Sequence, residues 1–77
     1  MSEVEFQKDV GGYADGKGQW YSVRLVGNRY VVVILQIDPG TRRHVLTAAT
    51  SEHLSAEDAW IAARGRAERS AAGEQED

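Results

Sequence analysis

The chain has no cysteine, one proline and no long apolar run, and each of these absences excludes a class of protein. Without cysteine, neither a disulfide framework nor a cysteine-based metal site can reinforce the fold, so the core must hold by packing or by association. The longest apolar stretch, Tyr30 to Leu35, has six residues, whereas a membrane-spanning helix needs about 20. We therefore expect a soluble protein that does not enter a membrane.

We also expect no secretion by a signal peptide. Residues 1–6 are acidic, whereas a signal peptide needs a basic segment followed by an apolar one. We expect a cytoplasmic protein, since a reducing compartment suits a chain without cysteine. A length of 77 residues fits one domain. We assign residues 1–72 to this domain and residues 73–77 to a frayed acidic tail, which has no apolar surface to bury.

The net charge of −3 is unevenly distributed along the chain. Residues 1–16 carry four acids against one lysine, and residues 47–77 carry seven acids against three arginines. Residues 17–46 carry five basic residues against one acid. A basic central segment therefore lies between acidic ends.

Two runs of aromatic and β-branched residues predict a β-hairpin. Residues 19–26 and 29–37 flank a Gly-Asn pair that suits a type II′ turn, with glycine at the first central position. This turn would place Trp20 opposite Leu35 and would fix which side chains share a face. Residues 29–37 are apolar on both faces, which is typical of a central strand.

The remaining strands have weaker signals. Alternating apolar residues predict a first strand over Glu3–Val10, and the glycine-rich residues 11–18 predict a loop. At Asp38–Thr41, proline and glycine predict a second turn in which Gly40 has positive φ. A third strand should follow over Arg42–Ala49.

A helix is predicted to begin after Ser55. The Ser55 hydroxyl can accept from a free backbone N–H, and the following acids favour the positive end of the helix dipole. Helical spacing gathers small residues and one tryptophan on a single stripe: Ala56, Ala59, Trp60, Ala63 and Ala67. The expected fold class is therefore α+β, with a three- to four-stranded antiparallel β-meander followed by one C-terminal helix packed on one face.

No catalytic, cofactor or metal motif is complete. Residues 11–17 approach a phosphate-binding loop, but Gly18 stands where Ser or Thr is needed. His44 and His53 are the only histidines and show no ligand spacing. Ser51, His53, Ser55 and Asp58 lie too close along the chain to suggest a hydrolytic triad. We therefore predict that the protein is not an enzyme and has no cofactor.

Two surface features remain as candidates for binding. One is the basic set of the central segment, for which ordinary solvated charge is the alternative interpretation. The other is the sheet face that a single helix leaves uncovered, which the N-terminal strand, a second copy or a partner must then cover. Together with the outer side of the helix, these features give the predicted partner-binding residues: Trp20, Arg24, Arg29, Val31, Val33, Leu35, Arg42, Arg43, Ile61 and Gly65, with Lys17 as a further basic residue.

Two resemblances bear on function. Gly18-Gln19-Trp20 opening the first long strand and residues 55–60 opening the helix resemble AP2-like and integrase arm-binding modules over residues 17–69. That resemblance implies DNA binding by a basic sheet. In size, glycine-rich strands and acidic tail, the chain is similar to small phage-encoded inhibitors of the anti-CRISPR type. This second resemblance implies a phage or mobile-element protein that blocks a larger nucleic-acid machine by surface contact.

We rank a non-catalytic protein-binding or inhibitory domain first and a DNA-binding module second. DNA-binding modules of this size are usually strongly basic, whereas this chain is acidic overall. The partner would be another protein, and we also expect a homodimer.

Overall fold

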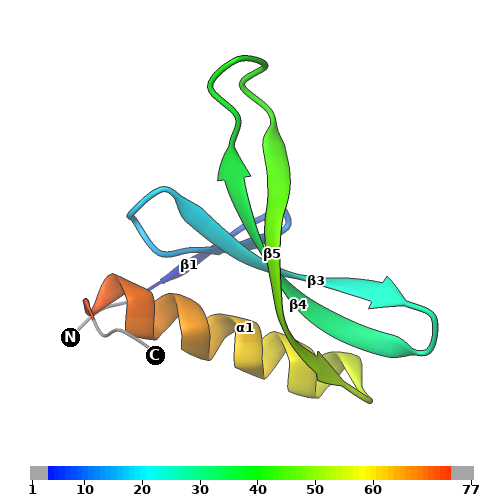
Figure 1. Ribbon diagram of the computed structural model, residues 1–77. Helices are drawn as coiled ribbons and strands as arrows, with labels where there is room; N and C mark the ends of the chain where they lie inside the picture. The colour runs from blue at the N-terminus through cyan, green and yellow to red at the C-terminus, as the bar shows by residue number, and fades with distance from the viewer. Residues whose placement is uncertain (1–3, 74–77) are drawn as a thin grey trace.

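The computed structural model describes residues 4–73 and has five strands and one helix (Figure 1). The predicted tail therefore lies outside the described residues, apart from Gly73. The elements are β1 (Glu5–Gln7), β2 (Gly12–Ala14), β3 (Gln19–Val26), β4 (Arg29–Ile37), β5 (His44–His53) and α1 (Ala56–Ala71). All strands form one antiparallel sheet in chain order, which confirms an α+β meander with a C-terminal helix.

The prediction of three to four strands was too low. The expected first strand over Glu3–Val10 ends at Gln7, where the chain turns, and β2 forms within the expected loop. The Gln7 carbonyl accepts from the Gly11 N–H at 2.7 Å, which closes this turn. A glycine-rich segment can still pair as a strand because its backbone N–H and C=O groups are available whatever the side chain.

The β3–β4 hairpin has the predicted register. Trp20 pairs with Leu35 and Val26 pairs with Arg29. Gly27 has a φ of 62°, whereas Asn28 is not among the residues with positive φ. This combination is the signature of a type II′ turn.

The turn after β4 differs from the prediction. Arg42, not Gly40, has the positive φ, at 63°. The Asp38 carbonyl accepts from the Arg42 N–H at 2.7 Å, and Asp38 Oδ2 accepts from the Thr41 hydroxyl at 2.9 Å. These bonds extend the turn through Arg42, so β5 begins at His44.

Strand β5 is longer than predicted and is bent by two β-bulges. The register shifts between Val32 and Val33 and again between Ile34 and Leu35, which leaves Thr50 and Thr47 as extra residues. Their hydroxyls donate to the carbonyls of Val32 at 3.2 Å and Ile34 at 3.3 Å. The end of β4, the turn and the start of β5 project from the body in Figure 1, and residues 36–47 are called the arm below.

The helix covers one face of the sheet, as predicted. Its Ser55 cap accepts from the Asp58 N–H at 3.1 Å. The predicted stripe is confirmed at Ala59, Ala63 and Ala67, which are fully buried, whereas Ala56 is exposed. The stripe packs against the sheet residues of the helix-side core, chiefly Tyr21 and Val32. Trp60 lies at its flank, edge to face with the rings of Phe6 at 5.6 Å and Tyr13 at 6.1 Å.

The opposite face of the sheet holds a second core. Val31, Val33 and Leu35 are only 8%, 2% and 2% exposed, and Val10 and Trp20 pack against them. These three predicted partner-binding residues are therefore covered within the chain itself. The β1–β2 segment carries Val10 over this face, which is the alternative in which the N-terminal part of the chain supplies the cover.

Polar contacts hold both covers in place. Trp20 Nε1 donates to Gln7 Oε1 at 2.8 Å, and the Ser22 hydroxyl donates to the Gly11 carbonyl at 2.6 Å. On the helix side, the buried Asp15 carboxylate accepts from the Ser70 hydroxyl at 2.6 Å, which ties the β2–β3 loop to the last turn of α1. Within residues 4–73, no helix is both long and apolar enough to span a bilayer.

Candidate interaction surface

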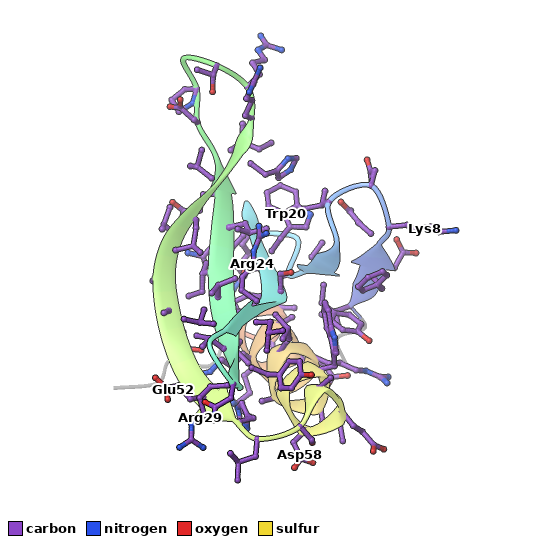
Figure 2. All side chains as sticks on the ribbon, turned by 90° about the vertical axis from the view of Figure 1, so that its right-hand side faces the viewer. Lys8, Trp20, Arg24, Arg29, Glu52 and Asp58 are labelled. Atoms are coloured by element: carbon purple, nitrogen blue, oxygen red, sulfur yellow. The ribbon has the colours of Figure 1, made fainter. Side chains whose placement is uncertain are left out.

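The structure separates the basic residues that the sequence suggested as one set. Lys17 lies beside Gly73 at the C-terminal end of α1. Arg42 and Arg43 are exposed at the tip of the arm. Figure 2 shows Arg24 and Arg29 at different heights along the sheet, with Arg29 near Glu52 at its lower end. The sheet therefore does not present one continuous basic face.

The arm instead combines exposed apolar side chains with a cationic tip. Ile37, Val45 and Leu46 are 46%, 41% and 52% exposed. Arg42 and Arg43 lie at the turn between Ile37 and Val45. These five residues are called the arm patch: Ile37, Arg42, Arg43, Val45 and Leu46. Apolar side chains surrounded by polar or charged ones are the usual composition of a protein-binding surface.

The base of the arm packs on the side of the sheet opposite the helix. The His44 ring stands edge to face on the Trp20 ring, with 4.6 Å between centroids. Trp20 in turn packs on the buried Leu35 and is anchored by its hydrogen bond to Gln7. This stacking fixes the start of β5 to the second core, so the arm patch is presented on an ordered support.

Strand β5 is also the free edge of the sheet. It pairs only with β4, and its residues from His44 to Ala49 are exposed. The two bulges at Thr47 and Thr50 interrupt its regular ladder, and bulges of this kind blunt an edge against pairing with another strand. This edge is therefore suited to contact a partner through side chains and not to accept an added strand.

The predicted binding residues on the helix, Ile61 and Gly65, lie outside the arm, as do three exposed apolar residues that were not predicted. Ile61 is 64% exposed on the outer side of α1, as expected. Gly65 is half-buried near the guanidinium group of Arg69. Leu25 and Val26 are exposed at the β3–β4 turn, and Leu54 is exposed between β5 and α1. None of these five residues is in the arm, so the structure does not unite them with the arm patch.

Two side chains that could take part in chemistry, Ser51 and His53, lie close together outside the arm. Ser51 Oγ lies 2.8 Å from His53 Nε2, because residues two apart share a face of β5. None of the hydrogen bonds found within residues 4–73 joins a carboxylate to His53, so the third member of a triad is missing from this part of the chain. The described residues also contain no group of three or more metal-ligating side chains.

An open hollow of about 330 Å³ lies beside β1 and β2. It is lined by Glu5, Gln7, Ala14, Asp15 and Gly16. The Asp15 carboxylate is already used, since it accepts from two backbone N–H groups and from the Ser70 hydroxyl. The hollow therefore lacks a free convergent group for a ligand on its buried side.

No protein-family model, curated protein or solved structure matches this chain. The function is therefore inferred from its surface alone. Sequence reasoning named Arg42 and Arg43 but missed the apolar residues of the arm patch, although Val45 and Leu46 lie just after the turn. Their position so close to a turn was the available signal, because a third strand covered by the helix would not need apolar side chains there on both faces.

Proposed function

We propose that the protein is a non-catalytic binding domain that acts on another protein by surface contact through the arm patch. The observation that carries the proposal is the exposure of Ile37, Val45 and Leu46 on a projecting hairpin whose base is fixed by Trp20 and His44. A chain of this size has little apolar surface to spare, because small domains bury only about 60% of the surface of the unfolded chain. Exposed apolar groups that the two cores do not use are best explained by a partner.

The composition of the arm patch indicates the kind of partner. Because Val45 lies on the opposite face of the arm from Ile37 and Leu46, the arm fits a groove with apolar walls on both sides and acidic residues near Arg42 and Arg43. Arginine at such a position can form bidentate contacts with carboxylates. The inhibitory role and the phage or mobile-element origin implied by the resemblance to small inhibitors belong to this proposal, as does a second copy of the chain as partner.

A DNA-binding module is the second candidate, and the arm favours it in one respect. A two-stranded β-ribbon fits the major groove, and Arg42 and Arg43 stand at the tip of this one. Against it, Lys17 and Arg29 lie far from the tip, and the net charge is −3. Two arginines provide few of the phosphate contacts that support nucleic-acid binding.

The protein-binding function is tested with arm variants. Tagged wild-type protein, the double variant Val45→Asp with Leu46→Asp, and the matched control Ile61→Asp are used to capture partners from the native host. We expect the wild-type protein and the control to retain the same partner and the arm variant to lose it. Equal capture by all three folded proteins would show that the arm is not the binding surface.

A gel shift with mixed-sequence DNA separates the second candidate. Phosphate contacts make affinity fall steeply with salt, whereas an apolar interface changes little. We expect no shift at moderate salt. A salt-sensitive shift that is lost in Arg42→Ala with Arg43→Ala, but retained in Lys17→Ala, would favour DNA binding by the arm.

A further inference from the structure

We infer that the arm patch binds a second copy of this chain, with the two β5 strands lying antiparallel across a twofold axis. The inference rests on the proposed function, because it uses the arm as a protein-binding surface and names the partner. It is argued from the charges at the two ends of β5 and from the shape of the strand between them.

The two ends of β5 carry opposite charge. Arg42 and Arg43 precede the strand, and they are called the basic pole. At the other end stand Glu52 and, in the first turn of α1, Glu57 and Asp58, which are called the acidic pole. All five side chains are exposed. Figure 1 shows β5 running from the arm to the start of α1, so the poles lie at opposite ends of the molecule along this strand.

The neighbours of the acidic pole do not cancel its charge. Arg29 lies on the same face as Glu52, since Glu52 pairs with Val31, two residues from Arg29 along β4. One arginine against three acids leaves the acidic pole negative. At the basic pole, Asp38 is the acid of the turn, and one carboxylate against two arginines leaves this pole positive.

A twofold axis makes these charges complementary. In a symmetric dimer the same surface of each copy is used, so a contact between one residue and another occurs twice. Antiparallel β5 strands would place the basic pole of each copy against the acidic pole of the other. A parallel arrangement would bring like charges together and is disfavoured.

The strand between the poles supplies the apolar part of the contact. Val45 and Leu46 are exposed, and the exposed residues that follow them, Thr47, Ala48 and Ala49, are small and uncharged. Strand β5 contains no lysine, arginine or proline, which are the residues that commonly protect a free edge. Because the bulges interrupt the regular ladder, the contact consists of side chains and does not need a continuous backbone pairing.

The decisive experiment uses two charge-reversal variants of the full chain. The first is Arg42→Glu with Arg43→Glu, and the second is Glu57→Lys with Asp58→Lys. In a dimer of either variant with itself, like charges would meet at both contacts between the poles. An equal mixture of the two restores opposite charges at both contacts. Thermal unfolding by circular dichroism establishes that each variant is folded, and Lys8→Glu with Arg24→Glu is the control for the change in net charge of the first variant.

Sedimentation equilibrium over micromolar concentrations gives the readout. We expect the wild-type protein and the control to approach twice the chain mass of 8.5 kDa, each charge variant to remain a monomer, and the mixture to form dimers. A wild-type protein that stays at 8.5 kDa, or charge variants that dimerise as well as the wild type, would overturn the inference.

The outcomes also distinguish this inference from the proposed function. A monomeric wild-type protein that still captures a different protein through Val45 and Leu46 would overturn the dimer and leave the binding function intact. If the charge variants and their mixture behave as expected but the wild-type protein captures no other protein, the result would support the inference and restrict the function to self-association.

Discussion

At the scale of single residues, Gly12 at the start of β2 is the glycine with the least room for a side chain among residues 4–73. A Cβ atom added there would lie 2.8 Å from the Tyr21 carbonyl oxygen and 3.3 Å from the Ser22 Cβ. The Tyr21 oxygen belongs to the backbone of a central strand and cannot move aside alone. Glycine at this position lets β2 approach β3 closely, which brings the Val10 segment over the second core.

We therefore expect Gly12→Ala to lower the free energy of unfolding by about 1 to 3 kcal/mol, the range for overpacking at a close contact. The matched control is Gly40→Ala, since Gly40 does not have positive φ and a Cβ there meets nothing closer than 3.9 Å. Its effect should stay within about 0.5 kcal/mol. Chemical denaturation of both variants measures the difference, and equal stabilities would mean that β2 does not lie against β3 as described.

Asp15 is the buried acid that connects the sheet to the helix. Its Oδ1 atom accepts from the backbone N–H groups of Lys17 at 2.8 Å and Gln19 at 3.2 Å, and its Oδ2 atom accepts from the Ser70 hydroxyl at 2.6 Å. Removing the carboxylate would leave these donors without their acceptor in a site that is only 4% exposed. Hydrogen bonds to charged groups contribute more than neutral ones, and unpaired buried donors are costly.

Asp15→Ala should accordingly reduce the free energy of unfolding by about 3 kcal/mol, and Ser70→Ala by about 1 kcal/mol, because the second change removes one bond of three. In the double variant the two losses should not add, since both act on the same bond. Asp9→Ala, at an exposed position, is the control. Additive losses in a double-mutant cycle would contradict the direct Asp15–Ser70 contact.

At the scale of elements, the helix depends on one large side chain among alanines. Trp60 is half-buried and contacts Phe6 and Tyr13, so it joins α1 to β1 and β2. Ala59, Ala63 and Ala67 let the helix approach β3 and β4, but their side chains bury little surface each. The indole ring therefore supplies much of the apolar contact between the helix and the short N-terminal strands.

Trp60→Ala is expected to cost about 3 kcal/mol, at the lower end of the range for aromatic truncation because the ring is only half-buried. Ile61→Ala is the control on the same turn of the helix, where the side chain is mostly exposed and a small effect follows. Thermal melts of both variants provide the measurement. A loss for Ile61→Ala equal to that for Trp60→Ala would mean that the helix packs by a different face.

Elements set by short-range rules could be predicted from the sequence. The two-residue turn at Gly27 fixed the β3–β4 register, and Ser55 fixed the start of α1, because both depend on atoms a few residues apart. The cover of the second core could not be predicted, since it depends on where the weakly patterned segment around Val10 folds in three dimensions. Prediction of the binding surface failed for the same reason, because the exposure of Val33 and Leu35 depends on whether that segment covers them.

At the scale of the whole molecule, the two cores share strands β3 and β4. Val32 of β4 packs toward the helix, while Val31, Val33 and Leu35 pack toward Trp20 on the other face. Neither core can lose its order without disturbing β4. The protein is therefore expected to unfold in a single cooperative step, as is usual for domains of this size.

The two tryptophans allow a direct test, because each reports on a different core. Trp60→Phe leaves Trp20 as the probe of the second core, and Trp20→Phe leaves Trp60 as the probe of the helix side. In each variant, the denaturation curve followed by tryptophan fluorescence should coincide with the curve followed by far-ultraviolet circular dichroism. A fluorescence transition in either variant that precedes the loss of secondary structure would show that the cores unfold separately.

The meander order of the sheet also bears on how the chain reaches this structure. Every strand pairs with its neighbour in sequence, so each pairing closes a short loop, and chains rich in such local contacts fold quickly. The helix is the exception, because the Asp15–Ser70 bond joins residues 55 positions apart. During synthesis the sheet is complete before α1 has emerged, and Tyr21 and Val32 then face water without their cover. The nascent chain should thus be most prone to aggregation in the interval between the completion of β5 and the emergence of α1.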